Sequence, residues 1–495
     1  MAVAAGLLLM VLSSVAAAGE PGVPEESWVY RELDRLRAAG LLQSGTSGFR
    51  PQSRTELARQ LAESRRLFDE RRDTFLAPQL QRLEEQFAVE LAEREDGAPA
   101  CYLRPIDELC LRYTFVDGEA DVQNERGRDF HEGSNLRFSA SSRGRWGPLS
   151  GYLRWEGRWL AEDDENPEAT AGRVEEGYVR VSAGRMFAQL GRQSLWWGPG
   201  RHGSLIMSDN ARPLDMLRVG TAEPLLLPGF LSRLGPVRFE GFLARLEKDR
   251  FVSRPWFAGA RVGLTPWPWL ELGASRVVIF GGGDRSITFR TVGDLISWQE
   301  KNSSNQPGNQ LAAVDWRLTV PWRAQPFELY GELGGEDEGG GFISKKAVLA
   351  GVYLPRLGPW SLFDVRVEYA DTYFGGHGGK DRIWYRHSQY RSGYTHHGRV
   401  MGHHAGTDAK DWYFELGVAP RKGLRLWAFA DWEERELSFD DPEKRREFGA
   451  GVEWRIDEHW TVTAGWTRED VENLGAIEGD DEDGDRLDLV VRWKF

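Results

Sequence analysis

From about residue 110 to residue 495, apolar and polar residues alternate with a period of two. This period places successive side chains on opposite faces of a β-strand, so the region is predicted to be a long series of strands. Each strand has one apolar face and one face rich in Arg, Glu and Asp. Clear apolar faces are Phe363, Val365, Val367 and Tyr369; Leu424, Leu426, Ala428, Ala430 and Trp432; and Leu487, Leu489, Val491, Trp493 and Phe495.

Two architectures produce this alternation: a soluble sandwich and a transmembrane barrel. The apolar faces repeatedly begin or end in Trp, Tyr or Phe, as the two aromatic girdles of a membrane barrel require. The run is also too long for one sandwich, and its final strand ends in Phe495, which resembles the signal read by the barrel-insertion machinery of the outer membrane. At about 22 residues per strand with its share of a turn, we expect an all-β transmembrane barrel of roughly 16–18 antiparallel strands.

Composition narrows the remaining classes of function. The net charge of −13 over 495 residues argues against a nucleic-acid-binding protein, which needs a basic face. No run of 18 apolar residues follows the N-terminal segment, and this excludes a helical membrane protein.

The N-terminal segment is apolar and ends in small residues. Residues 1–18 are expected to be a signal peptide cleaved after Ala16-Ala17-Ala18. An exported chain matures in an oxidising compartment, so its two cysteines, Cys101 and Cys110, are expected to form a disulfide.

Helical patterns occupy residues 24–97. Three helices are predicted: one after Ser27, one beginning at Ser53 with Glu56 at the capping-box position, and one beginning at Pro78. We expect this region to be a small periplasmic helical bundle, or a cap on something larger. The barrel is expected to cover residues 101–495.

The segment 189–213 breaks the rhythm of the strands. Trp196 and Trp197 precede a Gly-Pro-Gly turn and are followed by Arg and Asn residues. Proteins hold sugars by stacking the ring on an aromatic face while polar groups meet its hydroxyls or carboxylates. A girdle Trp pair followed by a structural turn is the alternative.

A second irregular segment, residues 372–412, holds six of the nine His residues, from His377 to His404. Such a cluster suggests zinc or copper, but no fixed carboxylate or Cys partner accompanies it. We therefore favour a polar loop, and predict neither a metal nor a cofactor. No GxSxG sequence is present, and no catalytic residue is predicted.

The two segments, GRQSLWWGPGRHGSLIMSDNARP and YRSGYTHHGRVMGHHAGTDA, together with the helical preface and the terminal Phe, resemble the Wzi family of capsule assembly proteins. The resemblance implies an outer-membrane barrel of about 18 strands with a small helical bundle, in a Gram-negative bacterium. It also implies a lectin-like, non-enzymatic role in retaining capsular or exopolysaccharide at the cell surface. The polysaccharide-binding residues that it implies are Arg192, Trp196, Trp197, Asn210, Arg391, Tyr394, Arg399 and His403.

Two other functions are compatible with the residues. A diffusion channel, or porin, is suggested by the charged inner faces, and an outer-membrane hydrolase by the many acids and the His cluster. The partners expected are the polysaccharide, outer-membrane lipid and the insertion machinery, with no nucleic acid, and the protein is expected to be a monomer.

Overall fold

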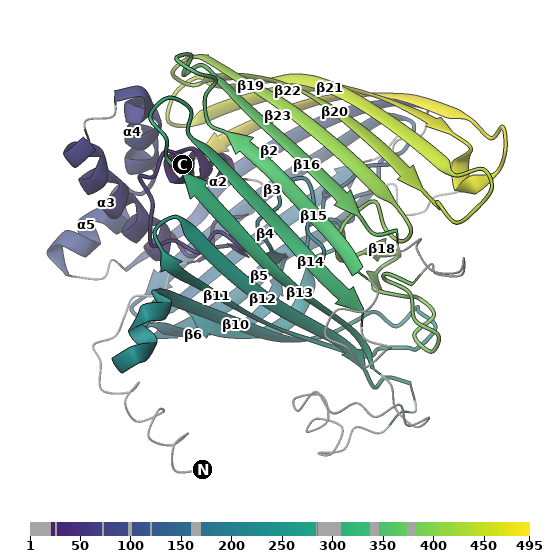
Figure 1. Ribbon diagram of the computed structural model, residues 1–495, viewed down its shortest axis with the longest axis horizontal. Helices are drawn as coiled ribbons and strands as arrows, with labels where there is room; N and C mark the ends of the chain where they lie inside the picture. Colours follow the sequence, from purple (N-terminus) through teal and green to yellow (C-terminus); the bar gives the residue numbers. More distant parts are fainter. Residues whose placement is uncertain are drawn as a thin grey trace.

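A computed structural model describes residues 21–24, 27–71, 74–97, 101–118, 121–159, 170–283, 285, 308–336, 346–373 and 383–495. The fold is a closed antiparallel β-barrel with a group of short helices at one end (Figure 1). We call this end the helix end and the opposite end the loop end. The predicted signal peptide, residues 1–18, lies outside the described residues, so its prediction stays open.

The described residues form 18 barrel strands, each hydrogen-bonded to its neighbours in chain order. Strand β2 pairs with both β3 and β23, and these two pairings close the cylinder. The barrel strands are β2 (Tyr102–Gly118), β3 (Gly133–Trp146), β4 (Leu149–Trp159), β5 (Thr170–Ala183), β6 (Met186–Gln193), β8 (Leu214–Thr221), β10 (Pro236–Arg245), β11 (Trp256–Trp267), β12 (Leu270–Phe280), β13 (Asn309–Val320), β14 (Phe327–Glu336), β15 (Lys346–Leu354), β16 (Phe363–Asp371), β19 (Lys410–Arg421), β20 (Leu424–Arg435), β21 (Glu443–Arg455), β22 (Trp460–Glu472) and β23 (Glu482–Lys494). The predicted all-β barrel is therefore confirmed.

The alternation predicts correctly which face of each strand points outward. Along β23, Leu487 and Leu489 are exposed, whereas Val490 on the other face is buried. Exposed tryptophans mark the helix end, where Trp460 and Trp493 stack across neighbouring strands at 5.4 Å. A second aromatic girdle lies toward the loop end, at Trp412, Trp432 and Trp466. These two rows fit the two interfaces of a membrane.

The N-terminal region contains α2 (Trp28–Ala38), β1 (Phe49–Arg50), α3 (Arg54–Arg71), η1 (Thr74–Leu76), α4 (Ala77–Gln86) and α5 (Ala88–Asp96). Ser53 begins α3 as predicted, because its hydroxyl accepts a hydrogen bond from the Glu56 amide (3.3 Å). The predicted third helix is two helices, since the backbone of Phe87 leaves the helical conformation between them. None of the helices in the described part of the chain is both long and apolar enough to cross a bilayer.

The helical region is fastened to the mouth of the barrel. Ser47 Oγ and the Gly48 amide both donate to the carboxylate of Glu271 on β12, at 2.7 and 3.1 Å. Arg31 on α2 forms an ion pair with Glu453 on β21 (3.0 Å). The helices therefore cover the helix end instead of hanging free of it.

Two long connections fold inward from the loop end and fill the interior. We call them the lumenal plug: residues 194–213 after β6, and residues 383–409 before β19. The first contains β7 (Trp196–Trp197), which pairs with β1 of the helical region. The second contains β17 (Thr395–His396) and β18 (Arg399–Val400). The plug and the helical region thus meet inside the barrel through the β1–β7 pair.

The predicted disulfide is wrong. Both Cys101 and Cys110 are free in the structure. Cys110 lies within β2, and Cys101 immediately precedes that extended strand. At about 3.3 Å per residue, nine positions along a strand span roughly 30 Å, far beyond the Cα separation that a disulfide tolerates.

Candidate functional site

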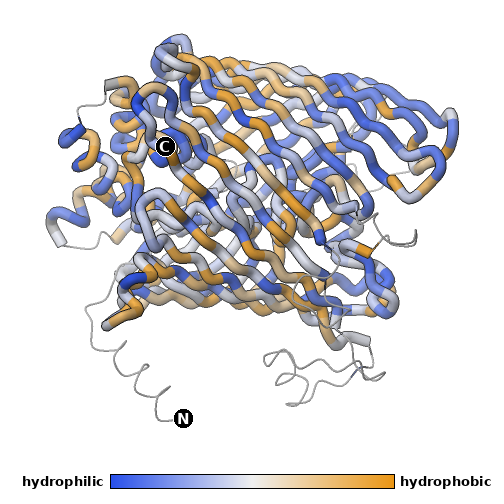
Figure 2. Tube along the Cα trace, viewed as in Figure 1, coloured by the Kyte–Doolittle hydropathy of each residue, from blue (hydrophilic) through white to orange (hydrophobic). Residues whose placement is uncertain are grey.

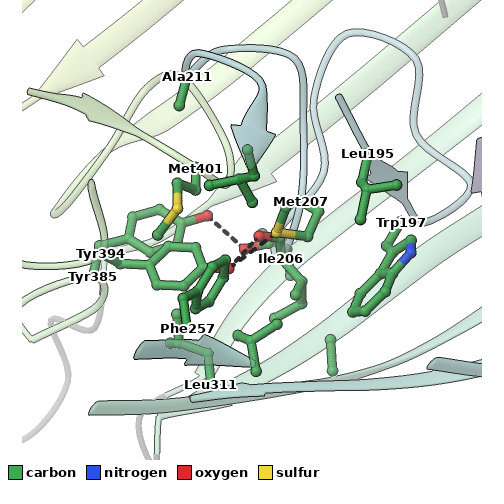
Figure 3. Packing of buried hydrophobic residues seen from close by; sticks show 14 of the residues in the cluster. Leu195, Trp197, Ile206, Met207, Ala211, Phe257, Leu311, Tyr385, Tyr394 and Met401 are labelled. Atoms are coloured by element: carbon green, nitrogen blue, oxygen red, sulfur yellow. Dashed lines mark hydrogen bonds between the residues drawn. The ribbon is translucent and has the colours of Figure 1, made fainter. Parts of the chain in front are cut away.

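The lumenal plug is built around a buried apolar cluster (Figure 3). Tyr385 and Tyr394 stack with their ring centres 5.6 Å apart, and Phe257 of the barrel wall meets Tyr394 edge-on at 5.7 Å. Ile206 and Met207 of the first plug segment pack in the same cluster. The two segments that stood out in the sequence therefore form one core with the barrel wall.

Hydrogen bonds to backbone carbonyls join the two plug segments. Tyr394 Oη donates to the Ile206 carbonyl (2.8 Å), and Tyr385 Oη donates to the Leu205 carbonyl (2.7 Å). Asn210 Nδ2 donates to the Val400 carbonyl (3.1 Å). The carbonyls of Leu205 and Ile206 are buried and lie outside the strands, so these bonds satisfy backbone groups that have no strand neighbour. Tyr394 and Asn210, both predicted to bind polysaccharide, are structural members of the plug.

The tryptophan pair faces protein on every side. Trp197 Nε1 donates to Glu240 on β10 (2.8 Å), and its ring lies 5.3 Å from Phe242. Trp196 Nε1 donates to the Gly200 carbonyl (3.1 Å), and the guanidinium of Arg50 sits over its ring at 5.3 Å. Trp196 is 2% exposed and Trp197 is 0% exposed, so neither ring offers a face to a sugar.

Three predicted arginines are more accessible. Arg192 lies on the outward face of β6, where it pairs with Asp215 of β8 (2.7 Å), so it does not face the lumen. Arg391 is exposed and sits over the Phe251 ring at 4.8 Å. Arg399 donates to the Val122 carbonyl (2.9 Å) and lies 3.4 Å from both Asp121 and Asp129. Arg391 and Arg399 are thus the predicted residues best placed at the loop-end surface.

The last predicted residue, His403, belongs to a buried cluster of charged groups near the loop end. His202 Nε2 lies 3.1 Å from Asp431 Oδ2 and 3.5 Å from Asp411 Oδ2. His404 Nε2 lies 3.3 Å from Asp411 Oδ2, and His403 Nε2 lies 3.6 Å from the same atom. The histidines come from both plug segments, whereas the two aspartates are inward positions of β19 and β20. His377, which was counted with this group in the sequence, lies outside the described residues.

An ion-pair network connects the plug to the helical region. Asp34 on α2 lies 2.7 Å from Arg201 of the plug and 3.2 Å from Arg366 on β16. Burial raises the pKa of the Asp34 carboxyl, but the guanidinium groups of Arg201 and Arg366 outweigh burial and hold this pKa well below its ordinary value. Asp34 is therefore an ionised anchor between the two parts.

A cavity of about 250 Å³ remains between the plug and the wall formed by β19–β23. Arg201 and His202 line it from the plug, and Tyr413, Glu447 and Arg486 line it from the wall. Its mixture of aromatic rings, arginines and acids is the chemistry expected of a sugar subsite. This cavity cannot be recognised from the sequence, because its wall residues are ordinary inward positions of long strands.

Comparisons with known proteins give the following matches. The sequence model of the family described as Capsule assembly protein Wzi matches residues 112–485. An uncharacterized 55.8 kDa protein in the cps region of Klebsiella pneumoniae is 32% identical over 178 residues, which is 35% of this chain and 35% of that protein. The match therefore spans about a third of that relative's length.

Among solved structures, the fold is similar to Wzi of Escherichia coli, described as an outer membrane protein involved in group 1 capsule assembly and a carbohydrate-binding β-barrel. The two are 19% identical, and the match covers 97% of this chain and 100% of that one with a TM-score of 0.74. OprD of Pseudomonas aeruginosa is 11% identical over 79% of this chain and 94% of its own, with a TM-score of 0.44.

Proposed function

Because the chain belongs to the family of the capsule assembly protein Wzi and is an outer-membrane barrel, we propose that it is a non-enzymatic, lectin-like protein that retains capsular or exopolysaccharide at the cell surface. The observation that carries this proposal beyond the family match is the lumenal plug. Among the described residues, protein fills the interior between the helical region and the loop end, which favours binding over passage.

The loop end offers a hydrophilic surface for a polymer. Outward residues of β20–β23 change from apolar to charged above the loop-end girdle (Figure 2). Arg446 pairs with Glu472 (2.9 Å), and Arg468 pairs with Asp470 and Asp485 (3.1 and 2.8 Å). These strands therefore extend beyond the apolar band, and their charged sides are available to hydroxyl and carboxylate groups of a polysaccharide.

Two of the predicted residues support binding at this end. Arg391 and Arg399 belong to the second plug segment, where Arg391 is exposed and Arg399 is partly exposed. A polymer would make many weak contacts of this kind, and their combined strength would exceed that of any one site. The helical region would then face the periplasm, because the helices lie at the end of the barrel opposite the loop end (Figure 1).

The test replaces the exposed Arg391 and the partly exposed Arg399 together, as Arg391→Ala with Arg399→Ala, and measures cell-bound against shed polysaccharide. The matched control is Arg233→Ala, an exposed arginine of η2 (Gly229–Leu234) at the helix end. We expect the double variant to shed polysaccharide while its barrel assembles normally, and we expect the control to behave as wild type. Equal retention by all three proteins would contradict binding at the loop end.

Two further measurements separate this function from the alternatives. A barrel filled by the plug is expected to show little single-channel conductance in planar bilayers, whereas a diffusion channel conducts. Incubation of the purified protein with isolated polysaccharide is expected to leave the polymer length unchanged. Shortening of the polymer would support a hydrolase instead.

A further inference from the structure

The cluster of histidines and aspartates near the loop end has the geometry of a metal site. His202, His404, Asp411 and Asp431 each offer one ligand atom, and these four atoms all lie within 4.8 Å of one another. They come from four separate parts of the chain: the first plug segment, the second plug segment, β19 and β20. We propose that they bind a divalent transition-metal ion, with zinc as the best fit.

The donor set and the distances both suit zinc. Zinc takes imidazole nitrogen and carboxylate oxygen at about 2.0–2.2 Å in a tetrahedral arrangement. Bonds of that length place the ligand atoms about 3.3–3.6 Å apart. In the structure the ligand atoms of His202 and Asp431 are 3.1 Å apart, those of His202 and Asp411 3.5 Å, and those of His404 and Asp411 3.3 Å. The side chains would need only small movements to hold the ion.

The charges also call for a cation at this point. Neither Asp411 nor Asp431 has an Arg or Lys partner among the ion pairs of the described residues, although both are 2% exposed. Their neighbour Glu433 differs, because Arg435 lies 2.5 Å from it. Two carboxylates and two neutral imidazoles would neutralise a divalent ion completely.

Unpartnered atoms point into the same site. Asp411 Oδ1 and Asp431 Oδ1 are buried and have no hydrogen-bond partner, whereas His404 Nε2 also lies 3.0 Å from Glu433 Oε1. The side chain of His404 is only 1% exposed. Leaving a buried polar atom unpaired costs about 1–3 kcal/mol, so two such carboxylate oxygens beside the same histidines are best explained by a cation that satisfies them.

Neighbouring residues are placed to support the ligands. His403 Nε2 lies 3.6 Å from Asp411 Oδ2, where it would orient that carboxylate. Tyr413 stacks on the His202 ring with the centres 3.8 Å apart. Asn124 Nδ2 donates to the His202 carbonyl (2.6 Å), which fixes the backbone of this histidine. The cavity beside His202 gives an ion a way to the site.

A second group, Glu247, His396 and His397, is a poorer candidate. His396 Nδ1 already lies 2.6 Å from Glu247, and Arg250 lies 3.4 Å from the same carboxylate. His397 is exposed. Variants of this second group therefore serve as controls for variants of the first group.

A metal at the proposed site would tie both plug segments to the barrel wall, because His202 and His404 are in the plug and Asp411 and Asp431 are in the wall. Removing the ion is then expected to loosen the plug while leaving the barrel closed. This inference does not depend on polysaccharide binding.

The test uses the full-length protein in detergent, stripped with a chelator and titrated with zinc chloride by calorimetry. We expect one equivalent of zinc per chain, and cobalt in its place should give the intense visible absorption of a tetrahedral site. Asp411→Asn and, separately, His404→Gln should weaken zinc binding at least 100-fold. His396→Gln, in the second group, and His459→Gln, at the helix end, should bind as wild type does.

Heat-modifiable migration on gels shows which variants are folded, and Asp431→Asn replaces any that fails to fold. The absence of zinc binding by folded wild-type protein would overturn the proposal, and so would binding that is lost in His396→Gln but kept in Asp411→Asn. As an independent readout, stripping the metal should speed protease cleavage within residues 194–213, and adding zinc back should reverse the effect.

Discussion

Replacing Trp197 with Ala should release the lumenal plug without opening the barrel wall. The ring is fully buried, contacts Phe242 on β10 and hydrogen-bonds Glu240. Truncating a buried Trp to Ala costs about 3–5 kcal/mol. The loss of stability should lie in the upper part of this range, because Glu240 also loses a hydrogen-bond donor, although it keeps its ion pair with Arg218.

A loss of about 4 kcal/mol corresponds to a roughly thousandfold rise in the population with an open plug, since each 1.4 kcal/mol is a factor of ten. When opening is fast relative to cleavage, proteolysis follows this population. Limited proteolysis of the intact barrel should therefore cut residues 194–213 about a thousand times faster in Trp197→Ala. Single-channel conductance should rise in parallel.

The control is Trp197→Phe, which keeps a ring against Phe242 but has no N–H to donate to Glu240. It should lose about 1–3 kcal/mol of plug stability, and its cleavage rate should rise about 5- to 140-fold. The reasoning would be refuted if Trp197→Ala formed a normal heat-modifiable barrel yet was cleaved at the wild-type rate. The ring would then not hold the plug to the wall.

Two more predictions concern the helical region and the cysteines. Asp34→Asn should leave Arg201 and Arg366 without their shared partner, cost about 3–5 kcal/mol and make residues 27–97 easier to cleave. Folding lowers the pKa of Asp34, so its stabilising effect is fully present above the unfolded pKa of Asp, about 3.9, and declines as the pH falls below this value. The melting temperatures of wild type and variant should therefore converge in acid. Denatured protein prepared without reductant should react with two equivalents of maleimide, one each at Cys101 and Cys110. The absence of this reaction would show that the two cysteines form a disulfide.

The sequence was sufficient to predict the barrel, because an apolar–polar period of two indicates that each strand has one face toward lipid and the other toward the interior. Positions such as Leu487 and Val490 follow this rule directly. The rule could not describe the interior itself. Aromatic residues such as Trp197 and Tyr394 are typical of sugar-binding sites. Only the inward folding of their segments shows that they pack against Phe242 and Phe257 instead.

The metal site that we propose is not evident from the sequence, for a related reason. The sequence favours a polar loop over a metal site because no carboxylate stands at a fixed spacing from the histidines. The missing partners, Asp411 and Asp431, are inward strand positions that look like any other lumenal charge. His202 is just over two hundred residues from His404 in the chain. Only barrel closure and the two inward loops bring these groups together.

The central claim is that the loop end of a plugged barrel holds polysaccharide. The most direct measurement is the binding of labelled polysaccharide, isolated from the strain that makes this protein, to the purified barrel. We predict saturable binding that falls at least tenfold when Arg391 and Arg399 are both replaced with Ala and is unchanged in Arg233→Ala. Binding that is absent from the wild-type protein, or equal in all three proteins, would contradict the claim.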